Sequence, residues 1–259
     1  MIAAGCDTGA LTVKAAVIKD GALAGTEMIR SRAKASDSAD EVTGKLLKRL
    51  GLSRGDIDCF VSTGYGRNTI PFADGDVSEI SCHGRGAVWL VPTIRTVIDG
   101  GGQDFKAIRV NEKGDIDSFQ MNMRCAAGTG RALEIMAESL GVDVGELGPL
   151  SLKATEPVVL RNYCCIIAEI KIRHLIMEGK SPEDIAAGIN DLTARRILGL
   201  LKNVGPRNDI AFTGGVAKNV GIVRFLGKAL GTEFAGLPVD PQLVGAVGAA
   251  VLAQERVTR

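Results

Sequence analysis

The sequence contains two copies of a residue pattern that can hold a phosphate group. In each copy an apolar segment ends in an aspartate, a glycine follows two residues later, and a lysine follows seven residues after the aspartate. The residues are Asp7, Gly9 and Lys14 in the first copy and Asp99, Gly101 and Lys106 in the second. Glycines let backbone N–H groups approach an anion closely, and aspartates can hold a hydrated Mg²⁺ through its waters. One copy alone is more typical of a tight turn, but the repeat predicts two hairpins that face one nucleotide.

Such a site would split the terminal phosphate bond of the nucleotide. In-line attack by water on that phosphate needs a metal that spreads charge and a polar side chain that orients the water. Asp7 is the candidate for positioning Mg²⁺, and Gln103 or Asp104 for orienting the water. The alternative for Gln103 is that it only closes a turn, as polar loop residues often do. We expect that replacing both Gly101 and Gly102 by valine abolishes nucleotide binding without unfolding the chain.

Length and composition limit the class of protein. The chain has 259 residues, more than one core usually holds, and the repeat favours two lobes, 1–92 and 93–259. Lys and Arg number 31 against 30 Asp and Glu, which offers no broad basic surface for nucleic acid or an anionic membrane. No apolar run approaches the ~20 residues that span a bilayer, and the N-terminus shows no secretory pattern. With six cysteines and no disulfide-rich pattern, the sequence indicates a soluble, cytoplasmic protein.

Hydrophobic periodicity predicts a β-β-β-α order that is used twice. In the first half we expect strands over 2–7, 11–18, 22–29 and 58–62 and helices over 38–51 and 78–90, with a type I′ turn at Asp20-Gly21. In the second half we expect strands over 94–98, 104–110, 115–121 and 232–236 and one that starts at 210. Its helices are expected over 130–140, 165–178, 182–203, 217–230 and 244–252, and the last has small residues that suit close packing against a sheet.

This arrangement resembles the actin, hexokinase and chaperone ATPase superfamily. The resemblance implies a two-lobed α/β fold with duplicated β-β-β-α-β-α subdomains and an ATP site between the hairpins. By this resemblance the phosphates are contacted by Gly9, Lys14, Gly101 and Gly102. The turn at Gly214 and Gly215 would support the adenosine, and Asn219 and Gln242 are candidate nucleoside contacts.

Two cysteines stand directly before predicted helices. Cys125 precedes a Gly-Thr-Gly turn and a helix, and Cys164 precedes the helix over 165–178. The positive end of a helix dipole favours anions and lowers the pKa of a thiol. A cubane iron–sulfur cluster needs four cysteines, so two from each of two subunits would complete it across a two-fold axis. From the residues alone, the alternative is that these cysteines only pack, as free cysteines often do.

Five segments together resemble the activator ATPases of 2-hydroxyacyl-CoA dehydratases and the related ATP-binding subunits of benzoyl-CoA reductase. They are 63–68, 78–83, 101–104, 125–131 and 212–219, and the resemblance covers nearly the whole chain. It implies a homodimer that holds one [4Fe-4S] cluster between subunits, with Cys125 and Cys164 as ligands. Cys165 follows Cys164 directly, so the choice of second ligand stays open. Ala10 and Leu11 replace small hydroxyl residues that the family tends to carry in the first hairpin.

The resemblance implies an ATP-dependent electron-transfer activator. A ferredoxin or flavodoxin would reduce the cluster, and binding of ATP and its hydrolysis to ADP would change the angle between the cluster helices. The electron would then pass to a dehydratase or reductase that acts on a CoA ester. Alternatives are a fixed ATP-binding subunit of a benzoyl-CoA reductase-type complex, a small-molecule kinase of the same superfamily without a cluster, and a nucleotide sensor.

The remaining chemically active residues have simpler expected roles. Packing is expected for Cys6, Cys59 and Cys82, and surface or helix packing for His83 and His174. The loop 65–67 either touches nucleotide or a partner, or is only a turn.

Overall fold

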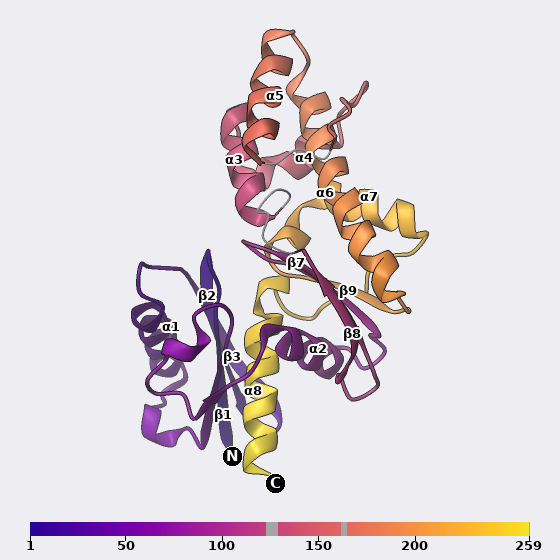
Figure 1. The fold of residues 1–259 in the computed structure, drawn as a ribbon. Helices are drawn as coiled ribbons and strands as arrows, with labels where there is room; N and C mark the ends of the chain where they lie inside the picture. The colour runs from indigo at the N-terminus through magenta and orange to yellow at the C-terminus, as the bar shows by residue number, and fades with distance from the viewer. Residues whose placement is uncertain (123–128, 162–164, 259) are drawn as a thin grey trace.

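The computed structural model describes residues 1–122, 129–161 and 165–258, which fold into two mixed β-sheets covered by helices (Figure 1). The first half of the chain forms β1 (Ile2–Thr8), β2 (Thr12–Lys19), β3 (Ala22–Arg30), α1 (Ala35–Leu50), β4 (Cys59–Thr63), β5 (Gly75–Asp76) and α2 (Glu79–Leu90). The second half forms β6 (Thr96–Gly100), β7 (Phe105–Val110), β8 (Ile116–Met121), α3 (Gly130–Leu140), α4 (Leu147–Ser151), α5 (Cys165–Met177), α6 (Pro182–Val204), β9 (Ile210–Thr213), α7 (Val220–Leu230) and α8 (Val244–Val257).

The two sheets repeat one topology. The strand order is β3-β2-β1-β4-β5 in the first sheet and β8-β7-β6-β9 in the second. In each sheet the leading strands run antiparallel, and the first of them pairs in parallel with a later strand, β1 with β4 and β6 with β9. The predicted α/β fold with a duplicated β-β-β-α unit is therefore confirmed. The type I′ turn is confirmed as well, because Asp20 and Gly21 have φ values of 50° and 84°.

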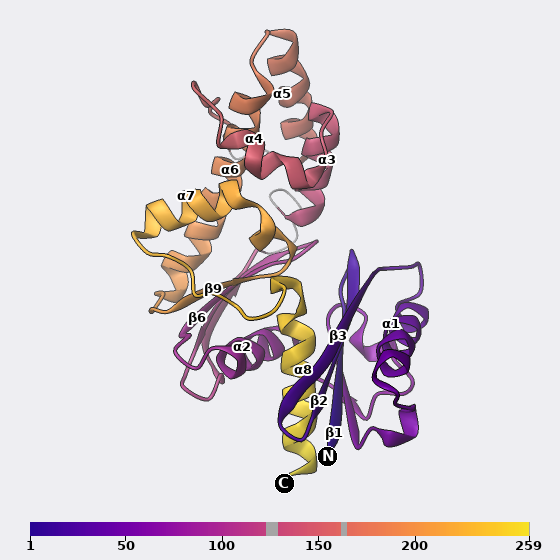
Figure 2. The same ribbon diagram turned by 180° about the vertical axis from the view of Figure 1, so that it is seen from behind.

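Helices α8 and α2 lie between the two sheets. α8 packs on β1, β2 and β4, and α2 packs on α8, β6 and β7. Small residues permit this close approach: a Cβ on Gly5 of β1 would collide with the backbone of Ala250, and one on Gly248 with the carbonyl of Cys82. The small-residue helix therefore packs closely against the first sheet, as predicted, and also against α2. Because α8, the last helix, packs against β1, the first strand, the C-terminus lies beside the N-terminus (Figures 1 and 2).

Helices α1 and α6 cover the outer faces of the sheets. α1 packs against β1, β2 and β3, and α6 packs against β7 and β8. α3, α4 and α5 form the end of the molecule farthest from the chain termini in both views (Figures 1 and 2). No helix among the described residues is long and apolar enough to cross a membrane. A boundary between two lobes after residue 92 stays a prediction.

The expected strand over 232–236 is absent from the described structure. In that segment Ala235 donates one backbone hydrogen bond to the carbonyl of Ile210, and no ladder follows. Pro238, two residues after the segment, has no N–H with which to continue a ladder. The prediction of a strand over 232–236 is therefore wrong, because the segment forms one backbone hydrogen bond where a strand needs a ladder.

Helix α7 begins three residues later than expected. Asn219 caps the helix, since its Oδ1 accepts hydrogen bonds from the N–H groups of Gly221 and Ile222 at 3.0 and 3.1 Å. The preceding Gly215–Lys218 segment forms a short 3₁₀ turn instead. Gly214 and Gly215, the two glycines that follow β9, lie at the start of this turn.

Candidate active site

A cavity of about 380 Å³ opens where the two predicted hairpins meet. It is lined by every predicted nucleotide contact and water-orienting residue, namely Asp7, Gly9, Lys14, Gly101, Gly102, Gln103, Asp104, Gly214, Gly215, Asn219 and Gln242. These residues come from segments as far apart as β1 and the short turn that precedes α8. The fold therefore brings the two copies of the sequence pattern to one place.

The two aspartates hold equivalent positions in the two sheets. The register partners are Lys14 and Thr63 for Asp7, and Lys106 and Thr213 for Asp99. A glycine follows each threonine, with φ of 87° at Gly64 and 79° at Gly214, a conformation that side chains rarely adopt. A Cβ would lie 2.5 Å from Asp7 Oδ1 in the first case and 2.8 Å from Asp99 Oδ1 in the second. The sequence carried this signal as a Thr-Gly pair after a buried strand in each half.

The two hairpin lysines are buried but have different partners. Lys14 Nζ lies 2.9 Å from Asp7 Oδ2. Lys106 Nζ contacts three carboxylates, those of Asp99 and Glu79 at 3.2 Å each and that of Asp104. Burial acts to lower the pKa of Lys106, but the three carboxylates outweigh it and raise this pKa above its usual range. Lys106 is therefore a fixed positive charge at the base of the second hairpin.

His83 is a site residue that sequence reasoning left out. It is 5% exposed, lines the cavity from α2, and its Nδ1 lies 3.0 Å from Thr213 Oγ1. Because Thr213 donates its own hydroxyl proton to the carbonyl of Ile98, His83 Nδ1 must be the donor in this contact. His83 Nε2 then faces Asp99 Oδ1 at 3.7 Å. Burial acts to raise the pKa of Asp99, but His83 and Lys106 outweigh it and lower that pKa.

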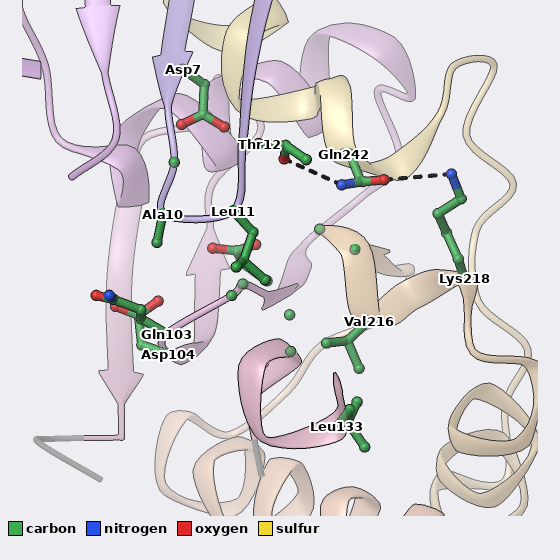
Figure 3. Close-up of a pocket in the computed structure, with 18 of the residues that line it drawn as sticks. Asp7, Ala10, Leu11, Thr12, Gln103, Asp104, Leu133, Val216, Lys218 and Gln242 are labelled. Carbon is green, nitrogen blue, oxygen red and sulfur yellow. Dashed lines mark hydrogen bonds between the residues drawn. The ribbon is translucent and has the colours of Figure 1, made fainter. Parts of the chain in front are cut away.

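The predicted nucleoside contacts lie on the segments that follow β9 and precede α8. Gln242 donates to Thr12 at 3.4 Å and accepts from Lys218 at 3.4 Å, which links β2 to the residues before α7 and α8 (Figure 3). Asn219 is engaged within the fold, because its Nδ2 donates to Asn190 Oδ1 at 3.0 Å while its Oδ1 caps α7. Gln242 is thus the more available of the two side chains.

Apolar and polar walls of the cavity are separated. Figure 3 shows Leu11 between Gln103 and Asp104 on one side and Gln242 on the other, with Val216 and Leu133 below it in this view. An apolar wall beside polar groups suits a ligand that has a flat ring and a charged tail. Gln103 is exposed, which is consistent with its alternative role in closing the turn.

The second hairpin is joined directly to helix α3. The N–H of Gly130 donates to the carbonyl of Gly101 at 3.0 Å, and the N–H of Arg131 donates to the carbonyl of Gly102 at 2.9 Å. A Cβ on Gly130 would lie 3.1 Å from the oxygen of Gly101 and 3.2 Å from the Cα of Gly102. The first turn of α3 therefore rests on the backbone that is predicted to bind phosphate.

The cysteines fall into two groups. Cys125 and Cys164 lie outside the described residues, just before α3 and α5. Cys6, Cys59 and Cys82 are buried free thiols, which confirms their predicted packing role. Burial raises the pKa of Cys82 to about 12, so this thiol is inert at neutral pH.

The two sheets and their connecting helices have the fold of hexokinase-type proteins, and the family match described below makes the chain a member of an ATPase family. The ROK hexokinase of Thermus thermophilus, 15% identical, superposes with a TM-score of 0.54 over 99% of this chain and 100% of its own, and so shares the fold alone. The chain belongs to the BadF/BadG/BcrA/BcrD ATPase family, whose profile matches residues 4–253. The predicted family is therefore confirmed.

Named relatives lie within the same family. The chain is 40% identical to a 2-hydroxyisocaproyl-CoA dehydratase activator of Clostridioides difficile over 98% of this chain and 95% of the relative. It is 34% identical to a benzoyl-CoA reductase subunit of Thauera aromatica over 82% of this chain and 77% of the relative. The solved activator of the 2-hydroxyisocaproyl-CoA dehydratase from Clostridium difficile, with bound ADPNP, is 39% identical. It superposes with a TM-score of 0.93 over 100% of this chain and 96% of its own.

Proposed function

We propose that this chain is an ATP-driven electron-transfer activator that serves a 2-hydroxyacyl-CoA dehydratase or a related CoA-ester reductase. Relatives named as dehydratase activators support this class of function. Within the molecule, the observation that carries the proposal is the pair of hydrogen bonds between the second hairpin and the first turn of α3. These bonds connect the nucleotide cavity to the helix that follows Cys125.

The donors around the cavity fit a magnesium nucleotide. In the part of the chain that the structure describes, no group of three Asp, Glu, His or Cys side chains is placed to hold a metal directly. Mg²⁺ commonly keeps several waters and takes its other ligands from substrate phosphates. Asp7 and Asp99 would accept hydrogen bonds from those waters, and the ion would spread the charge of the phosphates. Gly9, Lys14, Gly101 and Gly102 would contact the phosphates, and Gly214, Gly215, Asn219 and Gln242 would surround the nucleoside.

The sequence around α3 and α5 fits a shared [4Fe-4S] cluster. Cys125 and Cys164 would be its ligands, and the positive N-terminal ends of the following helices favour thiolates. One chain would supply two of the four thiolates, so a homodimer would supply all four. The first turns of α5 expose three isoleucines that a second copy would cover, Ile166, Ile167 and Ile170. The cluster would supply one-electron chemistry at low potential.

Coupling requires that nucleotide bind two conformations of the protein with different free energies. Phosphate bound at Gly101 and Gly102 would fix the backbone of the second hairpin. The carbonyls of the same glycines hold the first turn of α3, so loss of the terminal phosphate would alter the support of that helix. The angle between α3 and its copy in the partner subunit would change in response.

The other partners follow from this function. A ferredoxin or flavodoxin would supply the electron, and a dehydratase or reductase with its own redox centre would receive it. The similarity to a benzoyl-CoA reductase subunit supports a second candidate, a fixed ATP-binding subunit of such a complex. Purification from native cells separates the two, since a stable complex with catalytic subunits is expected for the fixed subunit alone.

Anaerobic purification with iron and sulfide quantification tests the proposal. We expect about four iron atoms per homodimer in the parent protein. Cys125→Ala and Cys164→Ala should lose them, whereas Cys82→Ala, a buried thiol beside α8, should keep them. Cys165→Ala decides the second ligand if Cys164→Ala retains iron. Colourless, iron-free parent protein that still turns over ATP would favour the kinase.

A further inference from the structure

One arginine at the cavity has a charge that no carboxylate of the described chain neutralises. The lysine and arginine side chains that line the cavity are Lys14, Arg30, Lys106 and Lys218. Lys14 and Lys106 are ion-paired with carboxylates of the hairpins and α2, and Lys218 Nζ lies 2.7 Å from Asp240 Oδ2. Among the residues that the structure describes, the exposed guanidinium of Arg30 has no hydrogen bond or ion pair. Its donors are therefore available to a ligand in the cavity.

The first sheet directs Arg30 towards the cavity. Arg30 is the last residue of β3 and stands opposite Thr12 of β2 in the strand register. Residues paired in this way project to the same face of a sheet, and so do residues two apart on one strand, such as Thr12 and Lys14. The backbone beside Arg30 is fixed to the hairpin tip, because the hydroxyl of Ser31 donates to the carbonyl of Gly9 at 2.8 Å. Arg30 therefore belongs to the same wall of the cavity as the first hairpin.

The first hairpin itself has few free side-chain donors. Ala10 and Leu11 at its tip have none. The hydroxyl of Thr8 is 2% exposed and donates to the carbonyl of Thr63 at 2.8 Å, and Lys14 shares its charge with a carboxylate. A second cation on this wall would therefore add to the phosphate contacts that the hairpin backbone can make.

We propose that Arg30 binds the nucleotide phosphates nearest the ribose, which ATP and ADP share. The inference rests on the proposed function in one respect, that the phosphates lie between the two hairpins. Thr12 indicates the position along the nucleotide, because its hydroxyl accepts from Gln242, a proposed nucleoside contact, at 3.4 Å (Figure 3). Lys14 lies two residues further along β2, beside Asp7, the proposed partner of hydrated Mg²⁺. Arg30, opposite Thr12, is therefore on the nucleoside side of Lys14.

This position determines what the contact can do. The planar guanidinium can donate two parallel hydrogen bonds to one phosphate. A contact with phosphates that are present before and after hydrolysis strengthens the binding of both nucleotides and leaves kcat unchanged. It also gives no preference between the ATP-bound and ADP-bound conformations. Arg30 therefore holds the nucleotide without affecting the coupling, unlike the second hairpin.

Calorimetric titration with ADP and with ADPNP tests the inference. Arg30→Gln should raise the Kd for both nucleotides about tenfold, with an unchanged melting temperature. The dependence of each Kd on NaCl concentration should weaken, because a charged contact is lost. Arg30→Lys keeps the charge without the planar fork, so its Kd should be intermediate. The kcat at saturating ATP should stay within about twofold of the parent value in both variants.

Arg32→Gln is the matched control. Arg32 lies two residues after Arg30, but its side chain is 65% exposed and is ion-paired with Glu41 of α1. It is not among the residues that line the cavity. Both Kd values and their salt dependence should therefore match those of the parent protein.

Three results would overturn the inference. One is a Kd for both nucleotides within about twofold of the parent value in Arg30→Gln. Another is a loss of affinity for ADPNP alone, which would place Arg30 at the terminal phosphate. The third is a loss of affinity with the parent's salt dependence, which would mean that the shape of Arg30 matters and its charge does not.

Failure of this inference is distinguishable from failure of the proposed function. If Arg30→Gln binds both nucleotides normally while the anaerobic parent keeps its iron and delivers electrons, this inference fails and the proposed function stands. A parent protein that binds nucleotide but holds no iron would overturn the proposed function. The contact between Arg30 and phosphate would then stand or fall by the same titrations.

Discussion

The two phosphate hairpins share a frame but are supported by different parts of the molecule. The tip of the first hairpin is bonded within its own sheet, because Ser31 at the end of β3 donates its hydroxyl to the carbonyl of Gly9 and its N–H to that of Leu11. The tip of the second is bonded to α3, a helix outside the sheet, through the carbonyls of Gly101 and Gly102. The two hairpins therefore share the residues that are proposed to bind a nucleotide, because both belong to the repeat. They differ in that only the tip of the second hairpin is hydrogen-bonded to α3, the helix that follows Cys125.

The hairpins also differ in charge. Lys14 neutralises one carboxylate, whereas Lys106 stands among three. A lysine with three carboxylates holds several elements together, since Glu79 comes from α2 and Asp99 from β6. The second hairpin is thus tied to two helices outside its own sheet, α2 through Lys106 and α3 through the carbonyls of Gly101 and Gly102.

The largest expected difference is in stability. Lys106→Met should lower the free energy of unfolding at pH 7 by about 3–5 kcal/mol, because it leaves buried carboxylates unpaired, and Lys14→Met by about half as much. The pKa of Asp99 is lowered in the fold, so its contribution is present above the ordinary aspartate pKa and is lost as pH falls through the folded value. Chemical denaturation should therefore show that the difference in unfolding free energy between the two variants becomes smaller as the pH is lowered. Equal losses of unfolding free energy in the two variants at pH 7 would contradict the expected difference between the two lysines.

The second expected difference is in nucleotide affinity. A Cβ on Gly102 would lie 2.8 Å from Leu11 Cγ, and one on Gly101 would lie 3.0 Å from the carbonyl of Asp104. The double change to valine at both glycines should abolish detectable ATP binding, a rise in Kd of at least about 100-fold or roughly 2.7 kcal/mol, with the circular dichroism spectrum retained. Ala10→Val at the exposed tip of the first hairpin should change it less than about tenfold. Unchanged affinity in the double variant would remove the phosphate assignment.

A third comparison isolates the coupling. Gly130→Ala places a methyl group against the backbone of Gly101 and Gly102, so α3 and the hairpin must shift relative to each other, which strains the two hydrogen bonds. We expect electrons delivered per ATP hydrolysed to fall about tenfold, roughly 1.4 kcal/mol of coupling, with the Kd for ATP within about threefold. Gly44→Ala on α1, where a Cβ meets nothing within 4 Å, is the control. If Gly130→Ala delivers as many electrons per ATP hydrolysed as the parent protein, the two hydrogen bonds between α3 and the second hairpin do not couple the two processes.

The smallest expected difference is in the outer turns of the repeats. Gly21 and Gly114 have φ of 84° and 81°, and alanine at either position should cost about 1–2 kcal/mol of unfolding free energy. At Gly21 a Cβ meets nothing within 4 Å, whereas at Gly114 it would lie 2.9 Å from the Cα of Arg85. Thermal denaturation should therefore show a larger loss for Gly114→Ala. A larger loss for Gly21→Ala would mean that the turn at Gly114 adjusts to a side chain more easily than its contacts with Arg85 indicate.

Local chemistry explains what could be predicted. The turn at Asp20-Gly21 depends on neighbours in the chain, and so does the start of the helix predicted over 182–203, where the hydroxyl of Ser181 accepts from the N–H of Asp184 at 3.1 Å. The expected strand over 232–236 failed because strand formation depends on a partner that sequence pattern alone does not reveal. The family was predictable because its motifs lie in short segments of the chain.

The sequence by itself determined the paired Asp-Gly hairpins, the family and the helices other than the short α4, which it did not predict. Tertiary structure decided that Glu79 and His83 enter the site, because α2 faces the cavity once α8 has packed against it. It also decided that Lys106 has three carboxylates and that α3 rests on one hairpin and not the other. Charge interactions and hydrogen bonds depend on distances of a few ångströms between residues far apart along the chain, and only folding sets those distances.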